Sequence, residues 1–148
     1  MLLTSSRFGS MEVDDQRAIQ FPKGILGFPR HKQYVLLQPN EDSYFYWLQA
    51  TDRTELAFVV TDPSLYVSSY RVPLNAEQRI EFGIEATDQV QVFVIVNNSK
   101  NVLTANFQGP LVINVHRRIG HQLVLSDRRF TTRVPLVELE EPVEAVAV

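Results

Sequence analysis

Short runs in which apolar and polar residues alternate recur along most of this chain, and turn residues separate them. The strongest is Gln89–Asn97, where valine occupies every second position from 90 to 96. Alternation with a period of two predicts β-strands, and turn signals every ~8–12 residues predict an all-β sandwich or barrel. The predicted strands cover 2–8, 10–13, 18–21, 34–37, 44–50, 56–61, 66–72, 89–97, 102–107, 111–115, 122–125 and 130–134.

One place favours a helix. Asn75 followed by Gln78 has the spacing of a capping box, in which the two side chains satisfy free backbone N–H groups at the start of a helix. Because residues 80–84 then alternate with a period of two, we expect a single helical turn before the chain becomes extended.

The segment 21–29 is predicted to be a turn-rich loop. Its two prolines exclude a central strand or a helix interior, and its two glycines predict backbone at positive φ. The apolar residues Ile25, Leu26 and Phe28 are expected to anchor this loop to the core.

The segment 104–114 is predicted to be two short strands broken by Gly109-Pro110. Alternation places Thr104, Asn106 and Gln108 on one face, with Ala105 and Phe107 on the other. Asparagine is depleted in strands, so Asn106 and Asn114 need either a structural hydrogen bond or a role on an exposed recognition surface. The structural role is favoured, because buried polar groups usually find partners.

Composition and charge describe an ordinary globular chain with an uneven charge distribution. The chain has 148 residues, 45% of them hydrophobic, and no cysteine, so neither a disulfide framework nor thiolate chemistry is expected. Residues 1–115 carry 9 basic and 12 acidic side chains, 116–135 carry 5 and 1, and 136–148 carry 0 and 4, for a net charge of −3. We therefore predict one domain over 1–135 and an acidic, flexible tail over 136–148 that is dispensable for folding.

No motif points to catalysis, a metal or a cofactor. His116 and His121 are five residues apart, which places them on opposite faces of a strand, and no carboxylate cluster shares their segment. Neighbouring carboxylates such as Asp14 and Asp15 also point apart in a strand. Nothing in the sequence resembles a secretory signal or a membrane span, so no membrane partner is expected. Since no catalytic or phosphate-binding motif is found, no small-molecule substrate is expected either.

A basic segment keeps open the question of nucleic-acid binding. Small barrels bind RNA by stacking bases on exposed aromatic residues beside arginines, and Phe130 is the only aromatic residue in this segment. A solvated face is therefore favoured for its arginines, which are Arg117, Arg118, Arg128, Arg129 and Arg133.

Several motifs, taken in order, resemble the FliW family of flagellar assembly factors. They span residues 3–135 and comprise Phe21-Pro-Lys-Gly-Ile-Leu-Gly-Phe28, Trp47-Leu-Gln49, Leu56-Ala-Phe-Val59, Asp62-Pro63, Val92-Phe-Val-Ile-Val96, Thr104-Ala-Asn-Phe-Gln-Gly-Pro-Leu-Val-Ile-Asn114 and Gln122-Leu-Val-Leu125. The first and sixth are the most specific. This chain departs from the family pattern inside the sixth motif, with Phe107 where Leu is usual and Gly109 where Ala is usual.

The resemblance implies a compact, mainly antiparallel β-barrel-like domain with one or two short helical turns and no catalytic activity. It implies a cytoplasmic protein that binds the translational repressor CsrA, relieves repression of flagellin mRNA, and also binds flagellin as the competing partner. Because asparagine is unexpected inside a strand, we hypothesise that this motif borders a partner surface, with partner contacts at Thr104, Asn106, Phe107, Gln108, Pro110 and Asn114. The family motifs imply structural roles for Phe21, Gly24, Gly27, Phe28, Trp47, Phe58 and Pro63.

The sequence leaves two alternative functions open. One is a small barrel that binds RNA directly through the arginines of 117–133, which would make binding strongly dependent on salt. The other is a flagellin chaperone that makes no contact with CsrA.

Overall fold

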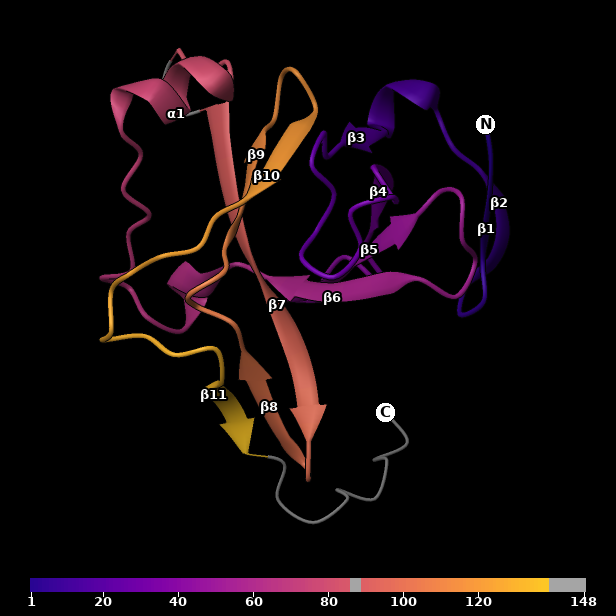
Figure 1. Cartoon of the computed structure of the whole chain (residues 1–148). Coiled ribbons are helices and arrows are strands. Elements are labelled where there is room, and N and C mark those ends of the chain that lie inside the picture. Colours follow the sequence, from indigo (N-terminus) through magenta and orange to yellow (C-terminus); the bar gives the residue numbers. More distant parts are fainter. Residues whose placement is uncertain (86–88, 139–148) are drawn as a thin grey trace.

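In the computed structural model, the described residues are 1–85 and 89–138. They form eleven strands, one α-helix and two 3-10 turns (Figure 1). The helical elements are η1 (Asp15–Arg17), η2 (Pro63–Leu65) and α1 (Ala76–Glu81). The strands are β1 (Leu2–Ser5), β2 (Gly9–Glu12), β3 (Ile19–Gln20), β4 (Gln33–Leu37), β5 (Phe45–Ala50), β6 (Ala57–Thr61), β7 (Val90–Ser99), β8 (Val102–Ala105), β9 (Leu111–Asn114), β10 (Ile119–Gln122) and β11 (Val134–Glu138).

Seven of the strands form a ring in the order β7-β6-β5-β4-β3-β10-β9, which closes because β9 also pairs with β7. All neighbours in the ring are antiparallel except β3 and β10, which join through the single parallel pair Ile119 and Gln20. The prediction of a compact, mainly antiparallel β protein is confirmed. The ring is irregular at this short parallel junction, so it is not a strict barrel.

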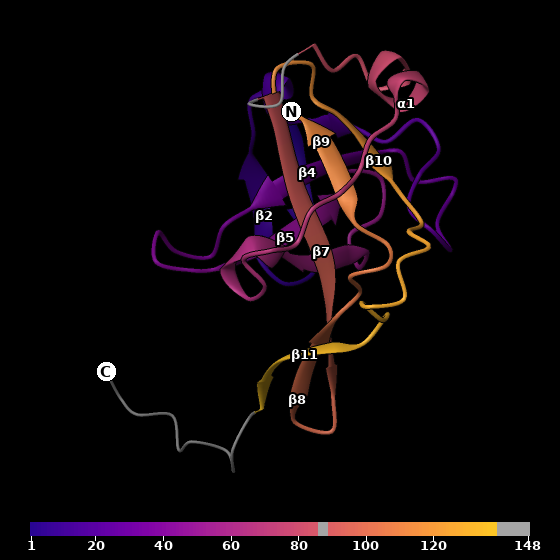
Figure 2. The same cartoon turned by 90° about the vertical axis from the view of Figure 1, so that its left-hand side faces the viewer.

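Strand β7 is the longest strand and belongs to both parts of the molecule. Its first residues pair with β9, Val94 and Ile95 pair with β6, and its last residues pair with β8. β8 then pairs with β11, so a three-stranded extension leaves the ring at one end, as Figures 1 and 2 show. The hairpin of β1 and β2 forms a separate small sheet at the right-hand edge of the view in Figure 1, whereas the extension points downward.

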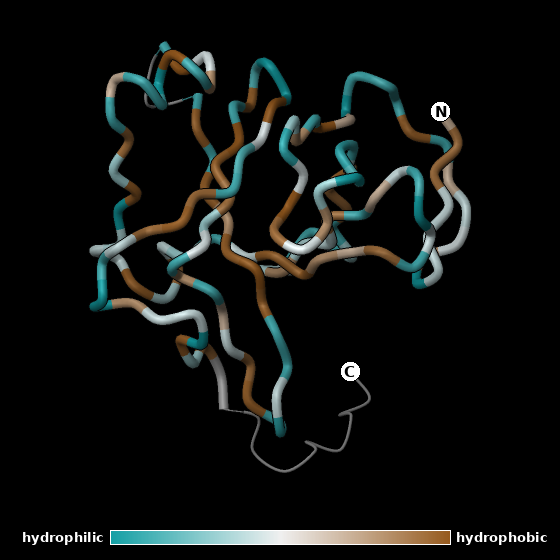
Figure 3. Tube along the Cα trace, viewed as in Figure 1, coloured by the Kyte–Doolittle hydropathy of each residue, from teal (hydrophilic) through white to brown (hydrophobic). Residues whose placement is uncertain are grey.

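Two hydrophobic clusters lie on the two sides of β7. Phe93 belongs to the cluster inside the ring, while Val94 and Val96 belong to a second cluster under the extension. Successive side chains of a strand point to opposite faces, so an uninterrupted apolar run lets one strand contribute side chains to both clusters. Hydrophobic stretches gather along the central strands, and the outer loops are hydrophilic (Figure 3).

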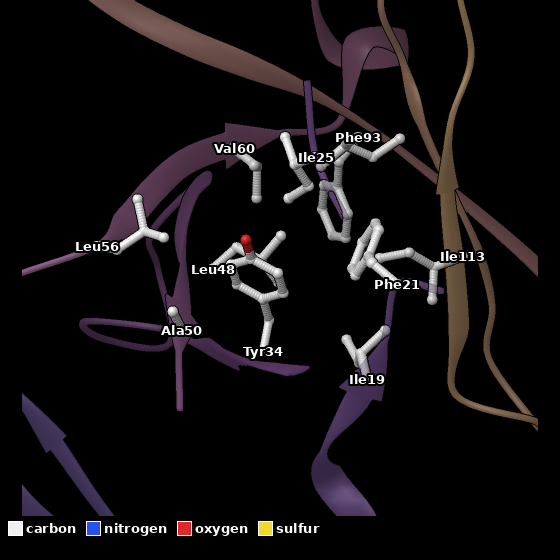
Figure 4. Packing of buried hydrophobic residues seen from close by; sticks show 11 residues of the cluster. Ile19, Phe21, Ile25, Tyr34, Leu48, Ala50, Leu56, Val60, Phe93 and Ile113 are labelled. Atoms are coloured by element: carbon white, nitrogen blue, oxygen red, sulfur yellow. The ribbon is translucent and has the colours of Figure 1, made fainter. Parts of the chain in front are cut away.

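The ring is filled by aromatic residues that meet edge to face. The rings of Phe21 and Tyr34 have centroids 5.5 Å apart at 82° (Figure 4). A Cβ on Gly120 would lie 2.5 Å from the Phe21 ring, so β10 can approach the core here only because position 120 is glycine. Burial, followed by the charge of Asp52, raises the pKa of Tyr34 to about 12.

Several predicted elements differ from the structure. Residues 66–72 are not a strand, because Asp62 and Pro63 start η2 and successive turns follow, with Tyr66 N and Val67 N donating to Pro63 O. Residues 80 and 81 continue α1 instead of becoming extended, because the capping box of Asn75 and Gln78 is fully formed and supports the start of the helix.

The last two predicted strands are also displaced along the chain. The partner of β9 is 119–122 rather than 122–125, because a tight turn at 115–118 returns the chain at once. The last strand is Val134–Glu138 rather than 130–134, so it extends past the predicted domain boundary at 135. Residues 139–148 of the predicted tail lie outside the described residues, and its flexibility stays a prediction.

Strand β11 should therefore matter for stability, unlike the residues after it. A chain that ends at Arg133 should lose about 2 kcal/mol of unfolding free energy, because the half-buried side chains of Val134 and Leu136 lose their packing on the second cluster. A chain that ends at Glu138 should match the full chain. Urea unfolding followed by the fluorescence of Trp47 measures both, and equal midpoints for all three chains would contradict this role.

Candidate functional site

The two most specific sequence motifs meet in space at Gln122. The Gln122 side chain accepts a hydrogen bond from Leu26 N at 2.8 Å and donates one to Gly109 O at 3.0 Å. Residues that are 96 and 13 positions away from Gln122 are thereby held by one amide group. The loop 21–29 and the turn at 106–110 are therefore parts of one site.

The loop 21–29 is built on glycine geometry and two apolar anchors. Gly24 has φ +67°, and a Cβ there would lie 2.5 Å from Phe28 O, so other residues are excluded by both conformation and space. Ile25 is 1% exposed, and Phe28 packs edge to face on Phe58 at 5.3 Å. The prediction that Leu26 also anchors the loop is wrong, since its side chain is 66% exposed.

Both asparagines of the 104–114 motif have structural hydrogen bonds. Oδ1 of Asn106 accepts from Gln108 N at 3.1 Å and Gly109 N at 2.9 Å. Asn114 is 1% exposed, and its Nδ2 donates to Phe82 O and Gly83 O. Its Oδ1 accepts from Arg117 N at 3.1 Å. The favoured structural interpretation is confirmed: Asn106 holds a turn, and Asn114 ties the end of α1 to β9.

The predicted polar face of 104–108 does not form, because β8 ends at Ala105 and the chain turns at Asn106. Of the six proposed partner-binding residues, Thr104, Phe107, Pro110 and Asn114 are buried. Phe107 is fully buried, and its carbonyl accepts from Tyr70 Oη at 2.6 Å. Only Asn106 and Gln108 are half-buried, so of the six they alone present part of their side chains to the surface.

The residues assigned structural roles lie in the core or in turns, except Trp47, which is half-buried on β5. Phe21 fills the ring, and Trp47 packs against Phe8 with the guanidinium of Arg7 4.3 Å from its ring centroid. Pro63 is buried at the start of η2. Gly27 has φ +88°, and a Cβ at this position would meet no atom within 4 Å, so the role of this glycine is conformational.

A groove of about 520 Å³ lies between the loop 21–29, α1 and residues 121–124. Its buried residues include Ile25, Phe82 and Leu123, whereas Leu26 and Val124 are 66% and 77% exposed. We call it the motif groove, because residues of the motifs at 21–28 and 122–125 line it. Its lining residues are Lys23, Gly24, Ile25, Leu26, Gly27, Pro29, Gln78, Glu81, Phe82, His121, Gln122, Leu123 and Val124.

One ion pair connects two walls of the motif groove. Lys23 Nζ lies 2.9 Å from Glu81 Oε1 and so joins the loop to α1. The hydrogen bond from Lys23, and then its charge, lower the pKa of the Glu81 carboxyl. Because both side chains are exposed, the pair adds little to the stability of the fold, and its main effect is to hold the loop 21–29 beside α1.

His121 is the buried titratable group of the motif groove. Its ring stacks on Phe82 with centroids 4.0 Å apart and an interplanar angle of 17°. Its Nε2 is buried without a hydrogen-bond partner among the described residues. Burial lowers the pKa of His121, the charge of Glu81 raises it, and the charge of Lys23 lowers it further, so the net direction is downward.

The five arginines of 117–133 lie in two separate places. Arg117 and Arg118 belong to the tip between β9 and β10, and the other three belong to the loop before β11 (Figures 1 and 2). Arg118 donates to Arg17 O at 2.7 Å, and Arg129 pairs with Asp127 at 2.7 Å. They do not form the continuous basic surface expected of an RNA groove.

Within 1–85 and 89–138, no group of three or more His, Asp or Glu residues has the arrangement to hold a metal ion. Over the same residues, no helix reaches the length and apolar character that crossing a bilayer requires.

The sequence and the fold both match one family. The family model described as FliW protein matches residues 2–136. This chain belongs to the FliW family. It is similar to the flagellar assembly factors FliW of Leptospira interrogans serovar Lai, at 34% identity over 88% of this chain and 89% of the relative, and of Geobacter sulfurreducens, at 36% over 93% and 87%. A crystal structure of the flagellar assembly factor FliW superposes with a TM-score of 0.85 at 33% identity, covering 93% of this chain and 97% of that one.

Departures from the FliW pattern are expected from the sequence at Phe107 and Gly109, and the structure shows which residues surround them. Phe107 belongs to an aromatic cluster with Tyr70 and Phe130, at centroid distances of 4.9 and 5.7 Å. A Cβ on Gly109 would lie 2.7 Å from Asn106 Nδ2 and 3.0 Å from Gln122 Nε2. An alanine there would therefore have to displace the two amides that hold the turn and the loop together.

His121 should make stability depend on pH. Its pKa in the folded protein lies below the unfolded value of about 6.5, so the unfolded chain takes up a proton first as the pH falls. The wild-type unfolding free energy should therefore be fully present above about pH 6.5 and decline below it, and His121→Gln should lack this component.

Urea unfolding between about pH 5 and 8 measures this effect, because imidazoles titrate in that range. His116→Gln, at an exposed histidine, is the control and should keep the wild-type dependence. If the difference in stability between wild type and His121→Gln is constant across the range, His121 does not have the depressed pKa.

Proposed function

We propose that this protein is a non-enzymatic, cytoplasmic flagellar assembly factor that regulates flagellin synthesis by exchanging partners. It binds the RNA-binding repressor CsrA, which relieves repression of flagellin mRNA, and it binds flagellin as the competing partner. The observation that carries the proposal is the match to the FliW family over residues 2–136, together with a shared fold at a TM-score of 0.85.

The charge of the protein supports an RNA-binding protein as a partner rather than RNA itself. The chain has 17 acidic and 14 basic residues, for a net charge of −3. A protein of this charge repels phosphate and attracts the cationic surface that an RNA-binding protein presents. Contact with such a surface would exclude RNA from it.

The motif groove supports binding of an amphipathic helix. It brings an apolar floor to the surface, and the exposed side chains of Leu26 and Val124 line it. A groove of this kind accepts the apolar face of a helix, and the terminal segments of flagellin are expected to be helices of this type. We assign flagellin to this groove.

The motif groove should therefore contribute directly to flagellin affinity. Leu26→Asp combined with Val124→Asp should weaken flagellin binding at least tenfold, because it places two charges where apolar contacts are buried. Leu2→Asp combined with Leu65→Asp is the matched control, since these two leucines are 68% and 55% exposed and neither lines the groove. Calorimetry with purified flagellin measures the affinities, and an unchanged affinity in a folded double variant would contradict the assignment.

Gln108 provides a separate test of the CsrA contact. Asn106→Ala would disrupt the turn itself, whereas the Gln108 side chain is half-buried and has no hydrogen bond among the described residues. Gln108→Ala should weaken CsrA binding several-fold, about 1 kcal/mol, with the fold intact. Gln20→Ala, at an exposed glutamine on β3, is the control. If the two variants and the wild type bind CsrA with equal affinity, the 106–110 turn does not contact CsrA.

The rival functions give different results with purified components. Direct RNA binding would be observed without CsrA and would weaken steeply as the salt concentration rises. The separation of the arginines does not favour this function. A flagellin chaperone would bind flagellin but not CsrA. If neither CsrA nor flagellin binds the full-length protein, the proposed function is wrong.

A further inference from the structure

A second groove lies beside the first half of β7, on the edge where β6 stops. It has a volume of about 340 Å³, within the range of ligand pockets, and we call it the β7 groove. Strand β7 forms one wall through Val90, Gln91 and Val92, and the segment 71–74, which has no regular secondary structure, forms another. None of its lining residues lines the motif groove.

The groove exists because Pro63 ends the pairing between β6 and β7. Thr61 pairs with Val94, so the same register would place residue 63 opposite Val92. Proline has no N–H to donate to a ladder, and Pro63 instead begins η2. The edge of β7 from Val90 to Val92 therefore has no strand partner on this side among the described residues.

The backbone of Val90 and Val92 faces the groove. Val115 N donates to Gln89 O at 2.7 Å, so Gln89 directs its backbone groups toward β9. In an antiparallel pair this direction alternates, so Gln91 and Phe93 also face β9, while Val90 and Val92 face the opposite edge. These are the groups that an added strand would use.

A side chain already occupies part of the place of the missing strand. Gln91 Nε2 donates to Val92 O at 2.9 Å and lies 3.5 Å from Asp62 Oδ2. It supplies a donor to the carbonyl that Pro63 leaves without a partner. The amide of an incoming peptide can replace it, because a glutamine side chain is free to rotate away.

The charges at the groove favour an acidic occupant. Arg71 is exposed, Arg79 projects from α1, and both line the groove. Among the described residues the one carboxylate that lines the groove is Asp62, whose Oδ1 accepts from Ser64 N and Ser64 Oγ at 2.9 and 2.7 Å, so two cationic side chains are present beside one anionic side chain. The apolar side chains of Val72 and Leu74 complete the lining. Cations, apolar walls and an open strand edge together match an extended peptide in which acidic and apolar residues alternate.

We propose that the β7 groove binds an extended acidic peptide segment of a partner protein, which adds to β7 as a strand at Val90–Val92 and places carboxylates at Arg71 and Arg79. The site is distinct from the motif groove, so it allows the protein to hold a helical and an extended partner segment at once.

The test uses isotope-labelled full-length protein and three synthetic probe peptides in NMR titrations. The probes are (Val-Glu)3, (Val-Lys)3 and a (Val-Glu)3 peptide whose valine backbone nitrogens are methylated. The first should shift the amide signals of Val90 and Val92, and binding should be at least tenfold weaker for the other two. The lysine peptide lacks the charge match, and the methylated peptide cannot donate to a strand edge.

Variants separate the groove from general electrostatics. Arg71→Glu with Arg79→Glu should weaken (Val-Glu)3 binding at least tenfold, while Arg30→Glu with Arg128→Glu, which changes the net charge equally, should not. No shift at Val90 and Val92, shifts confined to the motif groove, or equal binding of the methylated and unmethylated peptides would each overturn the proposal. The peptide comparison uses the wild-type protein, so it decides the question even if the variants do not fold.

Discussion

The structure depends on β7 being apolar on both faces. Because Phe93 points into the ring and Val94 and Val96 point into the second cluster, one strand supplies a wall to each core. The same strand closes the ring through β9 and carries the extension through β8. A polar residue between Val92 and Val96 would weaken one of the two cores, which is why this part of the strand is an uninterrupted apolar run.

Hydrogen bonds from single amide side chains hold the loops against this frame. Gln122 ties the loop 21–29 to the 109 turn, and Asn114 ties the end of α1 to β9. Gln49, 1% exposed, lies within 3.2 Å of four backbone carbonyls between β5 and β6. Each such amide satisfies backbone groups that irregular loops cannot satisfy themselves. In this protein, polar residues inside an apolar pattern thus mark the places where loops are held against the sheet.

Both candidate binding surfaces arise where regular pairing stops. The motif groove lies where α1 and the loop 21–29 meet the chain leaving β10, and the β7 groove begins where Pro63 turns β6 away. At such places backbone groups and apolar side chains stay at the surface, because no neighbouring strand covers them. Their different linings, one apolar with a buried histidine and one with two arginines, suit different partner segments.

The sequence by itself determined the features that depend on near neighbours along the chain. The alternation of 89–97, the capping box of Asn75 and Gln78, and the turn glycines of 21–29 were all predicted, since each is specified within a few residues. Tertiary structure decided which side chains are exposed. Leu26 has the pattern of an anchor but is exposed, and Phe107 has the position of a partner contact but is buried. Burial depends on which distant strands pair, and the open edge opposite Pro63 exists only in the register of β6 against β7, which no local pattern specifies.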